Sequence, residues 1–240
     1  MRGDESEPIG QEPYSQAISM AGVVDGERVL DLSGRAGAVA LQLAATASSV
    51  EAMQLDTELA EEGRRLAVAM GWRNVYFHPG ELHRLPFDPG QFDLVVWCLT
   101  LAQEPRPLAT LHEIVRVMAP GGRLIVQDVA AFGQPELDLK LWELERDRNP
   151  RHLLFYTPGE LRALLLLAGL QVEREEMSGM TQDFDYWADT AGPDAARRAD
   201  LKRVFFSMPP AGQDRLDLAL ADGRISFTYP VVTLLARPAS

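Results

Sequence analysis

The sequence predicts one α/β domain built on a mostly parallel, doubly wound sheet. The length of 240 residues suits one sizeable domain. Short apolar runs alternate with amphipathic segments from residue 28 to residue 130, and glycine or proline turns separate them. Alternation of this kind places a crossover helix between successive parallel strands, so that helices cover both faces of the sheet. The composition, 46% hydrophobic and 24% charged, is sufficient for a buried core.

The expected strands are the short apolar runs. They are Arg28–Leu32, Ser49–Leu55, Val75–His78, Phe92–Leu99, Arg123–Val129, Gln171–Glu175 and Ile225–Ala236, the last being one strand or a bent pair. Apolar residues at helical spacing predict the helices. These are Gln16–Val24, Ala38–Ala45, Glu58–Gly71, Leu108–Met118, Pro135–Arg148, Pro158–Gly169 and most of Tyr186–Asp217, with a break at Met208-Pro209-Pro210.

Charge and cysteine content limit the partners and the compartment. Acidic residues outnumber basic ones by 35 to 23, and a net charge of −12 repels nucleic-acid phosphates and anionic lipid headgroups. We expect a small-molecule substrate, with neither a nucleic-acid nor a membrane partner. The single cysteine, Cys98, excludes an internal disulfide and suits a reducing cytoplasm. Residues 1–13 lack the apolar core of a signal peptide and are expected to form a loose arm before one domain over residues 14–240.

The first strand-to-helix loop is the candidate ligand cradle. In an open parallel sheet, ligands bind outside the carboxyl ends of the strands, where this loop lies. The loop carries Gly34 and Gly37, and glycine lets backbone N–H groups approach a ligand closely. Taken alone, the pattern is equally consistent with a tight connection that needs glycine only for its backbone angles.

Further motifs follow this loop in a fixed order. They are Val29-Leu30-Asp31 with Gly37; Leu85-Pro86-Phe87 followed by Phe92-Asp93-Leu94-Val95; Arg116-Val117 with Pro120-Gly121-Gly122-Arg123-Leu124; and Asn149-Pro150-Arg151-His152 with Tyr156-Thr157 and Ala168-Gly169-Leu170. The ordered set resembles the class I S-adenosylmethionine-dependent methyltransferases, particularly the quinone-biosynthesis C-methyltransferase-like group, over about residues 27–175. The resemblance implies a Rossmann-like seven-stranded sheet, S-adenosylmethionine as cofactor, and residues 176–240 as a helical cover with the final strands.

The resemblance also implies a cofactor site. Its expected residues are Asp31, Ser33, Gly34, Arg35, Gly37, Gln54, Leu55, Glu81, Leu82 and Trp97. Gly37 would admit the methionine part of the cofactor, and Asp31 would orient the loop or reach the amino group through water. Glu81 would accept a hydrogen bond from the adenine amine, with the Leu82 backbone N–H facing the adenine ring. The loop and Glu81 are therefore expected at one edge of the sheet, with residues 179–215 packed over that edge.

Three positions depart from the family pattern Asp-x-Gly-x-Gly-x-Gly and its neighbours. Ser33 and Arg35 replace two glycines, and the Arg35 side chain could point to solvent, pair with the cofactor carboxylate or fill the pocket. Gln54 stands where the family has an acidic residue that holds both ribose hydroxyls, although Asp56 might take that role. Ala102-Gln103 stands where a His-His pair is frequent.

Few residues are candidates for acid–base or substrate roles. His152 could hydrogen-bond a substrate oxygen or act as a base, or it could be a packing histidine. Aromatic side chains could line a pocket for a flat apolar substrate or belong to the core; these are Tyr14, Trp97, Tyr156 and Trp187. The remaining histidines lack ligand spacing, so we assign no metal.

The favoured function is S-adenosylmethionine-dependent methyl transfer to a small apolar or aromatic molecule. One alternative is a methyltransferase-fold protein with a lost or repurposed cofactor site, such as a cyclase. Another is a non-catalytic partner subunit, which a large apolar surface patch would favour. The methyl acceptor, the atom that is methylated and the oligomeric state, for which a homodimer is one option, stay open.

Overall fold

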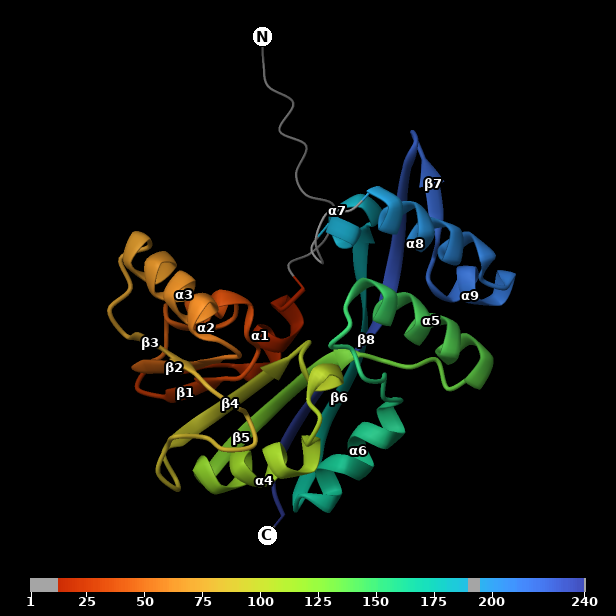
Figure 1. Ribbon diagram of the computed structural model, residues 1–240. Helices are drawn as coiled ribbons and strands as arrows, with labels where there is room; N and C mark the ends of the chain where they lie inside the picture. The colour runs from red at the N-terminus through yellow and green to blue at the C-terminus, as the bar shows by residue number, and fades with distance from the viewer. Residues whose placement is uncertain (1–12, 190–194, 240) are drawn as a thin grey trace.

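The computed structural model describes residues 13–189 and 195–239, so the predicted N-terminal arm lies almost entirely outside the described residues. One sheet, with strand order β3-β2-β1-β4-β5-β8-β6, runs through the molecule (Figure 1). The strands are β1 (Arg28–Asp31), β2 (Ser49–Gln54), β3 (Val75–Pro79), β4 (Phe92–Cys98), β5 (Met118–Val129), β6 (Leu170–Asp183), β7 (Ala219–Ala221) and β8 (Arg224–Pro238). β1 to β5 are parallel, and β8 is antiparallel to its neighbours β5 and β6. The predicted mostly parallel seven-stranded sheet is confirmed, and short β7 adds a hairpin to β8.

Helices occupy both faces of this sheet and the space beyond one of its edges. They are α1 (Ser15–Ala21), α2 (Ala40–Leu43), α3 (Thr57–Ala69), α4 (Pro107–Val117), α5 (Pro135–Arg148), α6 (Pro158–Leu167), α7 (Phe184–Asp189), α8 (Ala195–Ser207) and α9 (Pro210–Arg215), with 3-10 turns at Arg35–Gly37 and Leu101–Gln103. Local signals set several starts. The Asp56 carboxylate caps α3 by accepting from the Leu59 N–H at 2.9 Å, and Thr157 with Glu160 forms a capping box at α6.

Period-two alternation along the strands divides the core between the two faces. In β4, Val95 and Trp97 pack with α4 and α6, whereas Leu94 and Val96 pack with α1, α2 and α3. All four side chains are buried. The continuous apolar run that predicted a buried strand is therefore explained by helices on both sides.

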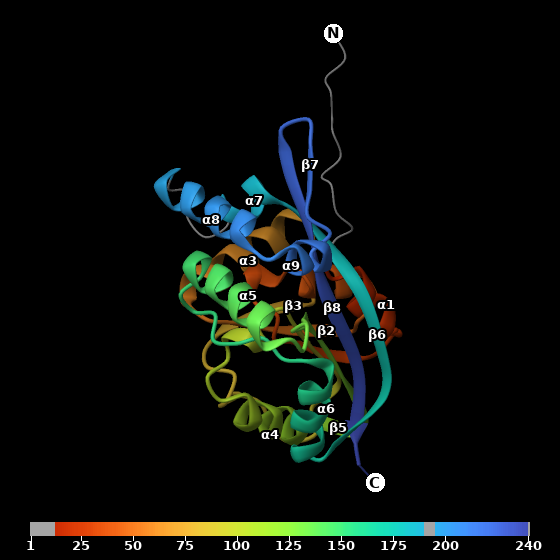
Figure 2. The same cartoon turned by 90° about the vertical axis from the view of Figure 1, so that its right-hand side faces the viewer.

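A third apolar cluster lies outside the sheet and forms a cover. It joins α5, α7, α8 and α9 to the far part of β8 through Leu141, Leu144, Phe184, Trp187, Leu201, Phe205, Leu216 and Phe227. Figures 1 and 2 show these helices gathered beyond the ends of β4 and β5, on the side that also carries the β7–β8 hairpin.

The cover depends on two strands that are longer than the sequence indicates. The prediction ended the sixth strand at Glu175, but β6 continues to Asp183 because β8 pairs with it from Leu170↔Pro238 to Asp183↔Ser226, with one shift of register between Val172 and Arg174. The start of the predicted helical cover, from residue 179, is thus strand. Its polar sequence hides the strand, because the hydrogen-bond partner is more than 40 residues away in the chain.

Phe77 of β3 fills a space that two glycines leave open. A Cβ atom at Gly37 would lie 2.4 Å from the Phe77 ring, and a Cβ at Gly63 of α3 would lie 2.3 Å from it. Gly37 also has φ +79°, which side chains rarely adopt. These two glycines let the Phe77 ring lock α3 and the loop after β1 against the sheet.

We predict that Gly63→Ala destabilises the fold by about 1–3 kcal/mol, although alanine is the better helix former, because its methyl group overlaps the Phe77 ring. Urea denaturation measures the change. Arg65→Ala, on the exposed side of the same helix, is the matched control and should leave stability nearly unchanged. The double variant Gly63→Ala/Phe77→Leu should recover part of the loss. A stabilised Gly63→Ala protein would contradict this packing.

Candidate functional site

A cavity of about 1460 Å³ separates the carboxyl edge of the sheet from the cover. The sheet side contributes Arg35, Ala38, Leu55, Leu99 and Asp128, which follow or end β1, β2, β4 and β5. The cover side contributes residues 148–152 after α5 and residues 180–187 of β6 and α7. Ligands of doubly wound sheets bind at this edge, so the cavity is the candidate site.

Asp31 organises the loop after β1. Its carboxylate is fully buried and accepts hydrogen bonds from the Ser33 N–H at 2.8 Å and the Ala40 N–H at 3.0 Å. Burial raises the pKa of Asp31 to about 6 against these bonds, which lower it. The two bonds close the chain into a turn between β1 and α2.

This turn contains four successive residues with positive φ. They are Gly34 at 68°, Arg35 at 50°, Ala36 at 52° and Gly37 at 79°. Left-handed geometry costs a non-glycine residue roughly 1–2 kcal/mol, so Arg35 and Ala36 need support from their surroundings. Gln54 at the end of β2 supplies it, because its side-chain oxygen accepts from the Ala36 N–H at 3.1 Å.

Only the oxygen of the Gln54 side-chain amide has a hydrogen-bond partner among the described residues. The side chain is buried, and its Nε2 has no hydrogen-bond partner among the described residues. Buried polar atoms are normally paired, so an orphan donor behind the turn is a candidate ligand contact. Asp56, the other candidate for this role, has its carboxylate at the start of α3.

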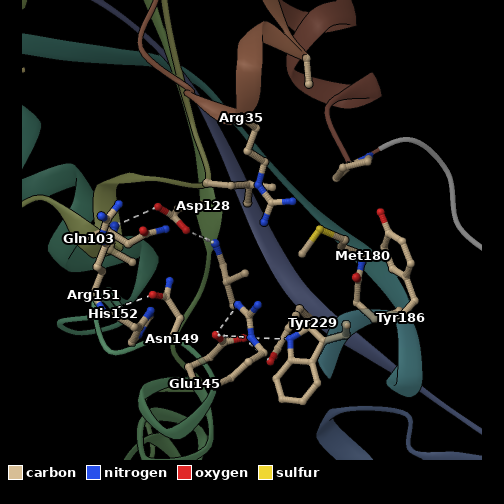
Figure 3. A pocket seen from close by; sticks show the side chains of 18 of the residues that line it. Arg35, Gln103, Asp128, Glu145, Asn149, Arg151, His152, Met180, Tyr186 and Tyr229 are labelled. Carbon is tan, nitrogen blue, oxygen red and sulfur yellow. Dashed lines mark hydrogen bonds and ion pairs between the residues drawn. The ribbon is translucent and has the colours of Figure 1, made fainter. Parts of the chain in front are cut away.

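The left-handed turn directs Arg35 into the cavity, where it faces Met180 and Tyr186 of the cover (Figure 3). No hydrogen bond or ion pair joins the Arg35 guanidinium to another described residue. Tyr14 lies close enough for Arg35 to lower its pKa, but burial dominates and raises the pKa of Tyr14 to about 12. The buried Tyr14 hydroxyl has no described partner either.

A polar wall faces this cation across the cavity. It comprises Gln103, Asp128, Asn149 and His152 (Figure 3). Asp128 accepts from the backbone N–H groups of Val129 at 2.8 Å and Ala102 at 3.2 Å, and burial raises its pKa to about 6. His152 is buried, its Nε2 has no described partner, and burial lowers its pKa.

Glu145 joins the cover to the sheet. Its buried carboxylate accepts hydrogen bonds from Tyr229 Oη at 2.6 Å, Trp187 Nε1 at 3.1 Å and Arg148 Nη2 at 2.6 Å. The Arg148 guanidinium also lies 5.0 Å from the centre of the Trp187 ring. These charge-assisted bonds join α5, which carries both Glu145 and Arg148, to Trp187 of α7 and Tyr229 of β8. Burial raises the pKa of Tyr229 well above its usual value, so its hydroxyl stays a donor.

The structure brings most of the predicted site residues to one edge. The parallel pairing of β1, β2 and β3 places the Gly34–Gly37 turn and Glu81 at that edge, as expected. Ser33 faces inward, where its Oγ accepts from the Cys98 N–H at 3.0 Å. Arg35 and Leu55 line the cavity, but the missing Cβ of Gly37 faces Phe77 and not the cavity.

Three other predicted residues lie away from the cavity lining. Glu81 has 74% of its side chain exposed and pairs with His83 at 3.2 Å. Leu82 is buried, and Trp97 is enclosed in the sheet core with its Nε1 donating to Thr100 Oγ1 at 2.9 Å. Trp97 is therefore not a wall of this cavity, whereas Tyr14 and Trp187 are.

Sequence reasoning missed Asp128 and Glu145. Asp128 had a usable signal, since it is an acidic residue near the end of an apolar strand, where a carboxyl edge would place it in the site. Glu145 had none, because its spacing to Arg148 is typical of a solvated helix face.

A family model described as a methyltransferase domain matches residues 11–175 of the chain. The chain belongs to this family, the class I S-adenosylmethionine-dependent methyltransferases. It is 25% identical to the methyltransferase YcgJ of Bacillus subtilis over 174 residues, which are 72% of this chain and 69% of YcgJ. The crystal structure of YcgJ aligns with a TM-score of 0.84 over 94% of this chain and 97% of that structure, at 22% identity.

Two further proteins are similar to this methyltransferase-family chain. It is 36% identical to the demethylmenaquinone methyltransferase of Clavibacter sepedonicus over 116 residues, which are 48% of this chain and 45% of that enzyme. The [4+2]-cyclase SpnF shares the fold, with a TM-score of 0.67 at 20% identity over 94% of this chain and 80% of SpnF.

Across residues 13–189 and 195–239, no helix combines the length and apolar character of a bilayer span. Within the same ranges, no three histidine, cysteine, aspartate or glutamate side chains cluster as a metal site.

We predict that Asp31→Asn shows the burial of this charge as a pH dependence. Asp31 takes up a proton more readily in the folded than in the unfolded wild-type protein. The free energy of unfolding of the wild type, relative to that of the variant, is therefore greatest at about pH 4 and below. That advantage should fall by up to about 3 kcal/mol as the pH rises from 4 through 6, and it should then stay constant. Urea denaturation at pH 4 to 7.5 measures it, and Asp200→Asn, at an exposed position of α8, is the control. A difference that is constant with pH would contradict the buried, ionising carboxyl.

Proposed function

We propose that this chain transfers the methyl group of S-adenosylmethionine to a small apolar or aromatic molecule held in the cavity. The observation that carries the proposal is the cavity between the carboxyl edge of the sheet and the cover. It has a strained turn and a cation at one side and a polar wall with a buried histidine at the other, and neither the cation nor the histidine Nε2 has a partner among the described residues. One side suits the cofactor and the other suits the acceptor.

The residues of the sheet edge fit the cofactor. Gln54 offers a buried Nε2 donor without a partner, which a ribose hydroxyl would satisfy. Arg35 offers a guanidinium without a described partner to the cofactor carboxylate, the strong charge-assisted kind of pair. Glu81, exposed at the same edge, would have to exchange its contact with His83 for one with the adenine amine. When bound, S-adenosylmethionine supplies a methyl group that is already activated as a sulfonium, so the protein's task is mainly positioning.

The opposite walls suit a flat acceptor. Tyr186, Trp187 and Phe155 line the cavity, and the described cover closes over it through the Glu145 contacts. Exclusion of water by such a cover strengthens the electrostatic interactions inside. The similarity to the demethylmenaquinone methyltransferase also supports an aromatic acceptor.

A specific observation favours a second candidate, a protein of this fold that no longer methylates. The Gln54 side-chain oxygen is already occupied by the Ala36 N–H, and Arg35 enters the cavity. A cofactor would have to share both. The [4+2]-cyclase SpnF has this fold, so a non-methylating role is compatible with it.

Calorimetric titration separates the two candidates. We expect the protein to bind both S-adenosylmethionine and its demethylated product S-adenosylhomocysteine, each at one site per chain. The absence of heat with both compounds, from protein shown to be folded by circular dichroism, would refute the methyltransferase proposal and leave the repurposed site.

Arg35→Gly tests how the cation is used. If Arg35 pairs with the cofactor carboxylate, the variant should lose about 1.5–3 kcal/mol of binding energy for S-adenosylmethionine, and Arg35→Gln should lose a similar amount. Folding should be unharmed, because glycine accepts the φ of 50°. Tighter binding by Arg35→Gly, with no gain for Arg35→Gln, would show instead that the side chain blocks the pocket.

A further inference from the structure

His152 is the one side chain of the polar wall whose buried polar atom has no partner among the described residues. It is 5% exposed, and its Nε2 faces no protein donor or acceptor there. Asp128 on the same wall is satisfied by backbone N–H groups of residues 101, 102 and 129. Since buried polar atoms are rarely left unpaired, the His152 ring is arranged for a group that enters the cavity.

The backbone fixes the position of this ring. The His152 N–H donates to the Asn149 carbonyl at 2.9 Å, and the next N–H, of Leu153, donates to the Ala102 carbonyl at 2.9 Å. The Phe155 ring lies 4.2 Å away, centre to centre. The imidazole is therefore held between the turn after α5 and the segment after β4, beside an aromatic surface on which a flat molecule can pack.

The surroundings keep the imidazole neutral. Burial lowers the pKa of His152, Glu145 opposes this and Arg148 adds to it. Those two charges come from the same helix, α5, and pair with each other at 2.6 Å, so their effects partly cancel. A neutral ring nitrogen can accept a proton from a substrate hydroxyl. A substrate with a buried ammonium group would instead need a carboxylate, and both Asp128 and Glu145 already bind protein donors.

We infer that the methyl acceptor is a hydroxylated aromatic or enolic molecule whose O–H group donates to His152 Nε2. This inference rests on the proposed function. The acceptor oxygen gives its proton to Nε2 while it forms a bond to the methyl carbon. The carbon–sulfur bond breaks with its electron pair left on sulfur, which yields the methyl ether, S-adenosylhomocysteine and an imidazolium. The imidazolium then releases its proton to solvent.

A matched pair of probes tests the hydrogen bond without turnover. We would titrate 1-naphthol and 1-methoxynaphthalene into the full chain with saturating S-adenosylhomocysteine, because the ether carries a methyl group in place of the hydroxyl proton and cannot donate a hydrogen bond. Wild type should bind naphthol about tenfold more tightly. His152→Phe should bind both equally, and His152→Gln, which keeps an acceptor oxygen, should retain part of the preference. His112→Gln, at an exposed position of α4, is the control and should behave as wild type.

Ring ¹H–¹⁵N spectra of the wild-type histidines give a second readout that does not depend on how the variants fold. Naphthol, but not its methyl ether, should shift the His152 signal and leave those of His78, His83 and His112 in place. Equal affinities in wild type, a preference that survives in His152→Phe, or an unmoved His152 signal would overturn the inference. Failure of S-adenosylhomocysteine to bind in the preceding calorimetry would refute the proposed function instead.

Discussion

The site depends on one buried carboxylate. Asp31 is the buried last residue of β1. Its carboxylate accepts hydrogen bonds from the Ser33 and Ala40 N–H groups, and these two bonds hold the intervening chain in a tight turn. A turn this short needs left-handed backbone at four successive residues, two of which are not glycine. The strain is stored at the site and is held by contacts that surround it, as is common where a ligand binds.

Each of these contacts comes from a different strand. Ser33 Oγ accepts from the N–H of Cys98, the last residue of β4, and Gln54 on β2 accepts from the Ala36 N–H. Phe77 on β3 fills the space at Gly37. Ser33 and Gln54, which depart from the family pattern, are thus integrated into the fold through their side-chain oxygens, whereas Gln54 Nε2 has no partner among the described residues. Arg35 is the exception, because its side chain leaves the turn for the cavity.

The cover has its own fixed point in Glu145. This carboxylate draws together α5, α7 and β8, and the aromatic cluster around Trp187 packs behind it. The cavity therefore has two sides with different chemistry. Among the described residues, the sheet side carries a guanidinium and an amide donor without partners, and the cover side carries an imidazole beside an aromatic ring. The proposed function assigns the polar cofactor to the first side and the flat, mostly apolar acceptor to the second.

The sequence by itself determined the sheet and its edge. The periodicity of apolar runs identified the strands within about two residues for β1 to β4, because each is a short apolar run that ends at a glycine or polar turn. Parallel order then placed the Gly34–Gly37 turn and Glu81 at one edge. The order of the motifs along the chain also identified the family. Asp31, Leu85-Pro86-Phe87 and Pro120-Gly121-Gly122 each belong to a local turn, so they are recognisable in the sequence alone.

Tertiary structure alone decided what the side chains do. Gly37 proved to serve packing, because its neighbour Phe77 is 40 positions away in the chain. The extension of β6 to Asp183 depends on hydrogen bonds to β8, and the burial of Glu145 depends on Tyr229 arriving from that strand. Local pattern carries no information about such distant partners. Burial and pairing, which raise the pKa of Asp128 and lower the pKa of His152, exist only once the chain has folded.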